Sequence, residues 1–143
     1  MFRGIVATAA AVGMSACGAS PITPPRIEQA IAPTFANLVQ VQVSWLGLAP
    51  MAAAQFNVTA SCRKAKMSAG GSNTGSGDWT CTLRWQGPDG QTLRDTFELF
   101  VTSDGCYTAT AAAEALGGPT LKASDNREVR NLLYAFDGCF DTM

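Results

Sequence analysis

The sequence contains no histidine, the side chain that most often acts as a general base near neutral pH and as a zinc ligand. Only 15% of the residues are charged, and the net charge of -1 arises from 10 basic and 11 acidic residues with no long run of either sign. This balance is not typical of a nucleic-acid-binding protein. The residues indicate no cofactor and no metal site.

A hydrophobic run long enough to span a membrane is also missing near the start of the chain. Residues 4–14, after the positively charged start MFR, are about eleven uncharged and mostly small or apolar residues, which is too few for a transmembrane helix. A positively charged start followed by a short apolar segment is typical of a signal peptide. The segment ends in MSAC, where Ser15 and Ala16 precede Cys17 and resemble the bacterial lipobox, although Met14 stands where leucine is usual.

We therefore expect residues 1–16 to be a lipoprotein signal peptide and Cys17 to become the acylated first residue, carrying palmitate-type chains. The alternative is an ordinary secretory signal, with Cys17 removed or unmodified. The proline-rich segment 17–25 is typical of an extended tether between anchor and domain. We expect residues 26–143 to form a single domain, since a chain of 143 residues with 47% hydrophobic residues suits one core.

Four cysteines remain after Cys17, an even set in a chain expected to be exported to an oxidising compartment. These cysteines, Cys62, Cys81, Cys106 and Cys139, are predicted to form two disulfides.

The segment before the first of these cysteines is ambiguous. Its apolar residues fit a helical stripe from about Thr34 to Leu46, with Thr34 as N-cap and Gly47 at the far end, but residues 39–45 also alternate like a strand. We favour the helix.

From Phe56 on, apolar and polar residues alternate, which is the pattern of a β-strand. Residues 56–62 and 79–85 each alternate between apolar and polar, and a hairpin about the Gly/Ser-rich loop between them places Cys62 opposite Cys81 on the buried face. A third strand over 92–102 has one acidic residue, Asp95, on its apolar face.

The tripeptide Asp-Gly-Cys occurs twice and is expected to form two different turns. Asp104-Gly105 suits a two-residue hairpin with positive φ at both positions, which would point Cys106 at the core. The second copy follows a predicted helix over residues 125–136, with Asp125 and Glu128 at capping-box spacing and a left-handed Gly138 at its end. That helix would bring Cys139 to Cys106. The predicted fold is α+β, an antiparallel sheet of about four strands packed with one or two helices and stabilised by two disulfides.

The elements GDWTCTLRW, DGCYTA and FDGCFD, together with the lipobox, resemble small actinobacterial surface lipoproteins of unknown function. The resemblance extends over most of the domain. It implies location and fold, and it brings no catalytic residues.

Three functions are compatible with these residues. The favoured one is a non-enzymatic envelope protein, anchored through Cys17 at the outer face of a bacterial plasma membrane, that contacts an envelope protein, glycan or lipid. The first alternative is a carrier of a small hydrophobic ligand or lipid, with a pocket near Phe35.

The second alternative is a serine hydrolase that uses Ser61 and Lys64. The segment SCRK at 61–64 matches S-x-x-K, and SDN at 124–126 matches the second motif of such enzymes. No K-T-G follows, however, and Ser61 lies in an alternating strand, so Lys64 would point to the opposite face.

The carboxylates of Asp104, Asp137 and Asp141 could bind calcium or act as acid and base, but solvated turn residues are the simpler interpretation. Trp79 and Trp85 could stack on a sugar ring, yet their alternation favours the core.

Overall fold

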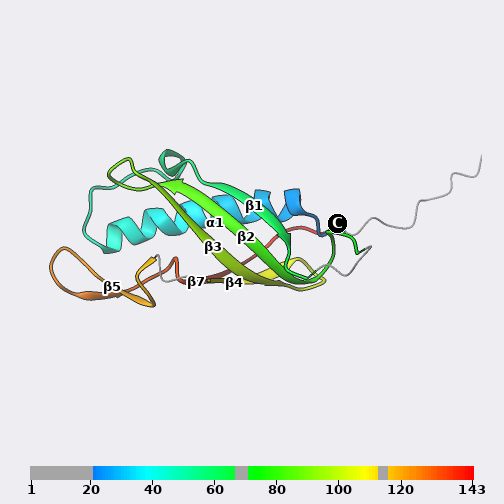
Figure 1. The fold of residues 1–143 in the computed structure, drawn as a ribbon. Coiled ribbons are helices and arrows are strands. Elements are labelled where there is room, and N and C mark those ends of the chain that lie inside the picture. Colours follow the sequence, from blue (N-terminus) through cyan, green and yellow to red (C-terminus); the bar gives the residue numbers. More distant parts are fainter. Residues whose placement is uncertain (1–20, 67–70, 113–115) are drawn as a thin grey trace, which may run out of the picture.

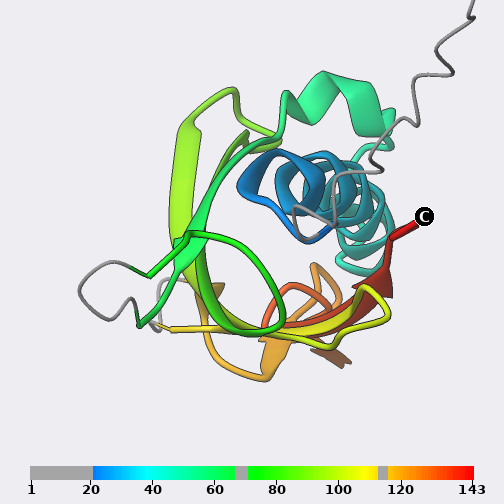
Figure 2. The same cartoon turned by 90° about the vertical axis from the view of Figure 1, so that its right-hand side faces the viewer.

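One long helix lies across the concave face of a curved antiparallel sheet, which wraps around about half of the helix (Figures 1 and 2). The computed structural model describes residues 21–66, 71–112 and 116–143. Five strands form the main sheet, in the order β1-β2-β3-β4-β7, and β5 pairs with β6 in a separate hairpin. The elements are α1 (Pro24–Trp45), the 3-10 helix η1 (Ala53–Phe56), β1 (Thr59–Lys64), β2 (Gly77–Gln86), β3 (Thr92–Val101), β4 (Cys106–Ala111), β5 (Thr120–Lys122), β6 (Glu128–Arg130) and β7 (Ala135–Cys139).

The α+β prediction with two disulfides is therefore confirmed, with five strands in the main sheet where about four were expected.

The helix α1 buries one stripe against the sheet. Its large buried apolar residues recur every four positions, which is the spacing of one helix face: Ile27, Ile31, Phe35, Val39 and Val43. Gly47, at φ +73°, ends the helix as predicted, because its N–H and that of Leu48 bond to the carbonyls of Ser44 and Val43 at 3.0 and 3.1 Å.

The predicted start of this helix was wrong by ten residues. Pro24 and Pro25 occupy the first helical positions, where a missing N–H costs nothing, so the last two residues expected in the tether belong to the helix. Pro33 lies inside the helix, and Thr34, expected as its N-cap, donates its hydroxyl to the Ala30 carbonyl at 3.0 Å. The strand alternative for residues 39–45 is wrong.

The strands alternate as predicted. On β2 the buried side chains are Trp79, Cys81, Leu83 and Trp85, and they face α1 together with Phe97, Leu99 and Val101 of β3. Phe56 is buried too, but from η1, so the first strand begins three residues later than expected, at Thr59.

Aromatic rings fill the space between helix and sheet. The ring of Phe35 contacts those of Trp85, Phe97 and Phe136 at centroid distances of 4.8, 5.6 and 5.8 Å, in edge or tilted arrangements. Phe35 and Phe97 are fully buried. Asp95 interrupts this apolar face as predicted and is itself buried.

The helix predicted over residues 125–136 is absent: this segment forms the β5–β6 hairpin turn, β6, a turn and the start of β7. The Asp125 carboxylate accepts the N–H of Arg127 at 3.2 Å, and Asn126 adopts φ +65°. These features close a tight turn between β5 and β6 in place of a helical first turn. An aspartate carboxylate can cap either structure, so its presence does not distinguish them.

Gly138 was also misplaced at a helix end. It lies in β7 directly opposite Tyr107 of β4, and a Cβ at this position would be 2.5 Å from the Tyr107 hydroxyl oxygen. Glycine is required here because the tyrosine ring lies over the backbone.

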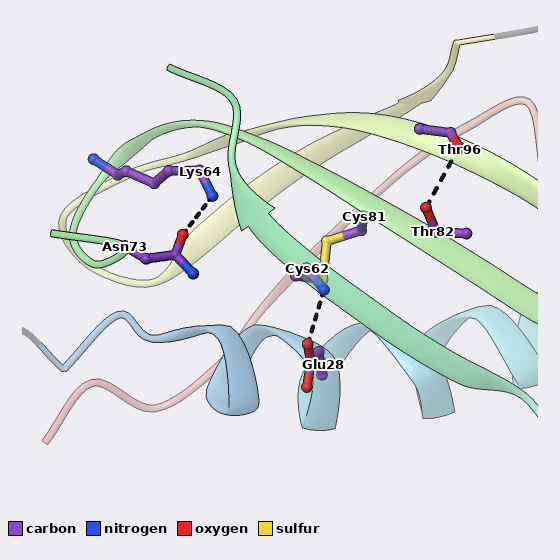
Figure 3. Close-up of a disulfide and its surroundings, with 7 residues drawn as sticks. All are labelled: Glu28, Cys62, Lys64, Asn73, Cys81, Thr82 and Thr96. Carbon is purple, nitrogen blue, oxygen red and sulfur yellow. Dashed lines mark hydrogen bonds between the residues drawn. A yellow bond between two sulfur atoms is a disulfide. The ribbon is translucent and has the colours of Figure 1, made fainter. Parts of the chain in front are cut away.

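The free edge of β1 is blocked by side chains from elsewhere in the chain (Figure 3). The Glu28 carboxylate of α1 accepts the N–H of Cys62 at 2.8 Å, and the Asn73 side chain accepts that of Lys64 at 2.7 Å. Because these outward N–H groups are bonded, this edge is poorly suited to pairing with a strand of another molecule.

Candidate functional site

The predicted disulfides are both present. Cys62 bonds to Cys81 between β1 and β2, and Cys106 bonds to Cys139 between β4 and β7, with each pair directly opposed across its ladder. Cys17, the predicted site of acylation, lies outside the described residues.

The second disulfide faces away from the core, contrary to the prediction for Cys106. Four residues, Thr102 to Gly105, connect β3 to β4. The N–H of Thr102 bonds to the carbonyl of Cys106 at 2.8 Å, so the loop itself has three residues, Ser103 to Gly105. Only Gly105 of the Asp-Gly pair has positive φ. One more residue in the loop exchanges the two faces of the following strand, so Tyr107 takes the inner position and Cys106 the outer one.

Ser61 and Lys64 are not brought together as a hydrolytic pair would require. Ser61 is exposed on the outer face of β1, and the Lys64 ammonium donates to the carbonyl of Ser76 at 2.7 Å. Residues three apart on a strand point to opposite faces. Ser124 of the SDN segment lies near Gly47 at the end of α1.

Of the acidic residues considered as a cation site, Asp104 and Asp141 act in local turns, whereas Asp137 lies in β7 with an exposed side chain. Asp104 accepts hydrogen bonds from the Thr102 hydroxyl and from the N–H of Cys106, and these bonds lower its pKa. Asp141 accepts the N–H of Met143 at 2.8 Å. In the described part of the chain, no group of three or more acidic or cysteine residues is arranged to hold a metal ion.

Trp79 and Trp85 are core residues, with exposed fractions of 1% and 3%, whereas Trp45 is 44% exposed. The exposed large apolar residues include three near the end of α1: Val41, Trp45 and Leu48. Their clustering marks this end of the molecule as a candidate for binding.

A surface hollow lies between the end of α1 and the β5–β6 hairpin. Its volume is about 410 Å³, and its lining residues are Ser44 and Trp45 of the helix with Arg127, Val129 and Arg130 of the hairpin. Trp45 follows the last residues of α1 that the main sheet covers, so its ring lies beside the hairpin.

Two hydrogen bonds hold the walls of the hollow together. The N–H of Ser124, at the start of the hairpin turn, donates to the Leu46 carbonyl at 3.0 Å. The buried Gln42 side chain accepts the N–H of Leu132, just after β6, at 2.6 Å. The hairpin is therefore attached to the helix on both of its sides, and the hollow is largely preformed.

The two arginines differ in their partners. The Arg127 guanidinium bonds to the exposed Asp125 carboxylate at 2.5 Å, which lowers the pKa of Asp125. Arg130 makes no ion pair or side-chain hydrogen bond with any described residue. A positive charge in the hollow is thus available to a ligand.

The hollow lies at the end of the molecule remote from the point where the chain enters the domain. The start of α1 lies beside the C-terminus, where Arg26 donates to the Asp141 carbonyl at 3.2 Å, and the other end of α1 reaches the β5–β6 hairpin (Figure 1). A helix of 22 residues separates these ends by about 33 Å.

Two of the other surface hollows bear on the alternative functions. One, of about 370 Å³, is bounded by small side chains of α1 and η1 such as Ala36 and Ala54. The other, of about 310 Å³, lies beside the outer disulfide and the exposed ring of Phe100. A hydrophobic-ligand carrier would have to use a surface hollow such as these, because aromatic rings fill the interior around Phe35.

Comparison with family models, curated proteins and solved structures found no significant match to this chain. Of the helices in the described residues, none combines the length and apolar character needed to cross a membrane.

Sequence reasoning missed the hollow for two reasons. Trp45 fits the same apolar stripe as the buried residues of α1, and a stripe does not reveal where the covering sheet ends. The arginines were assigned to a helix, which would have placed Arg127 and Arg130 on a solvated helix surface.

Proposed function

We propose that this protein is a non-enzymatic binding module of the bacterial envelope, anchored through an acylated Cys17 at the outer face of the plasma membrane. The observation that carries the proposal is the arrangement of the two ends of α1. The chain enters the domain at one end, and the exposed apolar residues with an available arginine lie about 33 Å away at the other.

The disulfides support an extracytoplasmic location. Two disulfides in so small a domain are typical of proteins that fold under oxidising conditions, and each contributes about 2 to 4 kcal/mol. The signal-like residues 1–16 and the lipobox-like approach to Cys17 support the same location and supply the anchor.

The anchor and the hollow together define a geometry for binding. A tether that ends near the start of α1 would hold that end toward the membrane and present Trp45 and the β5–β6 hairpin to the cell wall. A ligand in the hollow would then be bound without contact with the bilayer.

The proposal is tested by producing the full chain in a bacterium with a clickable fatty-acid analogue. We expect the wild-type protein in the membrane fraction, labelled, and digested by protease added to spheroplasts. The Cys17→Ala variant should lose the label and leave the membrane fraction.

A double variant, Cys106→Ser with Cys139→Ser, is the matched control, because it removes two other sulfur atoms and keeps Cys17. It should remain labelled. Label retained by Cys17→Ala, or wild-type protein found only in the soluble fraction, would contradict the lipid anchor.

A further inference from the structure

The hollow beside Trp45 combines an exposed indole ring with guanidinium groups in a small concave space. Its volume of about 410 Å³ is in the range of small-ligand sites. Its polar groups are the two arginines and Ser44, and no carboxylate lines it.

These groups have complementary preferences. An indole face packs well against the C–H face of a pyranose ring, because it offers a flat apolar surface at low conformational cost. A guanidinium binds a carboxylate through two parallel hydrogen bonds, and a serine hydroxyl can bond to a sugar hydroxyl. A ligand that satisfies all three carries a ring, a carboxylate and hydroxyl groups.

We propose that this hollow binds a carboxylate-bearing sugar unit of an acidic envelope polysaccharide. Trp45 stacks on the sugar ring, and Arg130 binds the carboxylate. Arg127 keeps its bond to Asp125 and shapes the wall of the hollow. This inference rests on the proposed envelope location and names the class of ligand.

The surroundings favour a glycan over the other two envelope partners. A lipid surface lies at the opposite end of α1 if the anchor is Cys17, and the hairpin charges are mixed, with Asp125 and Glu128 beside the arginines. Mixed charge disfavours adsorption to an anionic membrane. An acidic protein would need a broad basic surface, whereas one arginine in this hollow has no partner among the described residues.

Trp45 supplies a direct signal for the test, because the other two tryptophans are buried. Acrylamide should quench mainly Trp45 fluorescence in the full chain as isolated in nonionic detergent. We expect a short oligogalacturonate to protect Trp45 from quenching, and a neutral galactose oligosaccharide of equal length to protect it much less.

Variants assign the contacts. Arg130→Ala should weaken oligogalacturonate binding about tenfold or more, because a charge-assisted hydrogen bond is lost, and Arg130→Lys should restore part of it. Arg94→Ala is the matched control, since Arg94 is an exposed arginine on the outer face of β3 and does not line the hollow. It should bind as the wild type does.

Trp45→Phe keeps a ring and removes the exposed indole. Calorimetry should show binding within a few-fold of the wild type for Trp45→Phe and none for Trp45→Ala, with circular dichroism confirming that both are folded.

Equal protection by the neutral sugar, equal losses in the Arg130 and Arg94 variants, or no protection at all would overturn the proposal. Stronger protection by polyglutamate or by phosphatidylglycerol vesicles would also overturn it, in favour of a protein or lipid partner. None of these outcomes depends on the Cys17 labelling, so the proposed lipid anchor and the proposed ligand can be refuted independently of each other.

Discussion

The two faces of the main sheet carry the same kinds of side chain in very different surroundings. Cys81 and Phe97 lie on the inner face against α1 and are fully buried, whereas Cys139 and Phe100 lie on the outer face and are exposed. Phe97 and Phe100 are only three residues apart on β3. Position relative to the helix, more than residue type, therefore decides what a side chain contributes to this fold.

The first prediction compares the disulfides. From the entropy of the unfolded chain alone, the outer disulfide should stabilise the fold by about 0.5 kcal/mol more than the inner one. The reason is its longer sequence separation, 33 against 19. Replacing the inner pair by alanine also removes two buried sulfur atoms, at roughly 1 kcal/mol each. Burial therefore outweighs loop length, and Cys62→Ala with Cys81→Ala should cost about 5 kcal/mol in unfolding free energy against about 4 for Cys106→Ala with Cys139→Ala.

Urea unfolding of both double variants measures this difference. A larger loss for the outer pair would mean that loop closure dominates and that the inner sulfur atoms contribute little packing.

The second prediction compares the two phenylalanines of β3. Phe97→Ala should cost about 3 to 5 kcal/mol, because its ring packs edge-on against Phe35 and Phe136 and no water can replace it. Phe100→Ala should change stability by less than about 0.5 kcal/mol. Similar losses in urea unfolding would contradict the assignment of the faces.

The third prediction concerns Gly138, whose missing side chain leaves room for Tyr107. Gly138→Ala should destabilise by about 1 to 3 kcal/mol, because its Cβ would be 2.7 Å from the Tyr107 ring carbon Cζ. Asp137→Ala, the neighbouring position on the outer face, should be close to neutral in the same thermal unfolding assay. Tolerance of alanine at 138 would show that the ring can move aside.

The fourth and smallest effect is a dependence on alkaline pH. Burial raises the pKa of the Tyr107 phenol, and the negative charge of Asp137 raises it further. The unfolded chain then loses this proton at lower pH than the folded one, so stability should fall as pH rises above about 10. Tyr107→Phe should flatten this decline, and an unchanged slope would contradict the shift.

The sequence was sufficient to predict which side chains of β2 lie on the inner face and how β1 and β2 pair. Alternation on residues 79–85 identified the buried side chains of β2, and the hairpin about the Gly/Ser-rich loop correctly opposed Cys62 to Cys81. The cysteine count and the two Asp-Gly-Cys copies also identified the second pair correctly.

Which side chains of β4 lie on the outer face could not be predicted, because this depends on the length of the loop between β3 and β4. A hairpin of two residues at Asp104-Gly105 and one of three residues have nearly the same sequence signals, yet they send Cys106 to opposite faces. The capping-box spacing at Asp125 likewise could not distinguish a helix start from a turn, since the same carboxylate closes the β5–β6 turn.

The candidate site was the least predictable part. The hollow forms only because the β5–β6 hairpin meets the end of α1, through contacts such as Leu132 with Gln42, which are 90 residues apart in sequence. Local patterns carry no information on such a contact.

The central claim, an anchored and exported domain with two different sheet faces, is tested most directly by intact mass and peptide mapping of the protein from bacterial membranes after mild reduction and alkylation. The account predicts acyl chains on Cys17 and alkyl groups on Cys106 and Cys139, with Cys62 and Cys81 still bonded. A bare Cys17, thiols that are free before reduction, or alkylation of Cys62 and Cys81 first would contradict it.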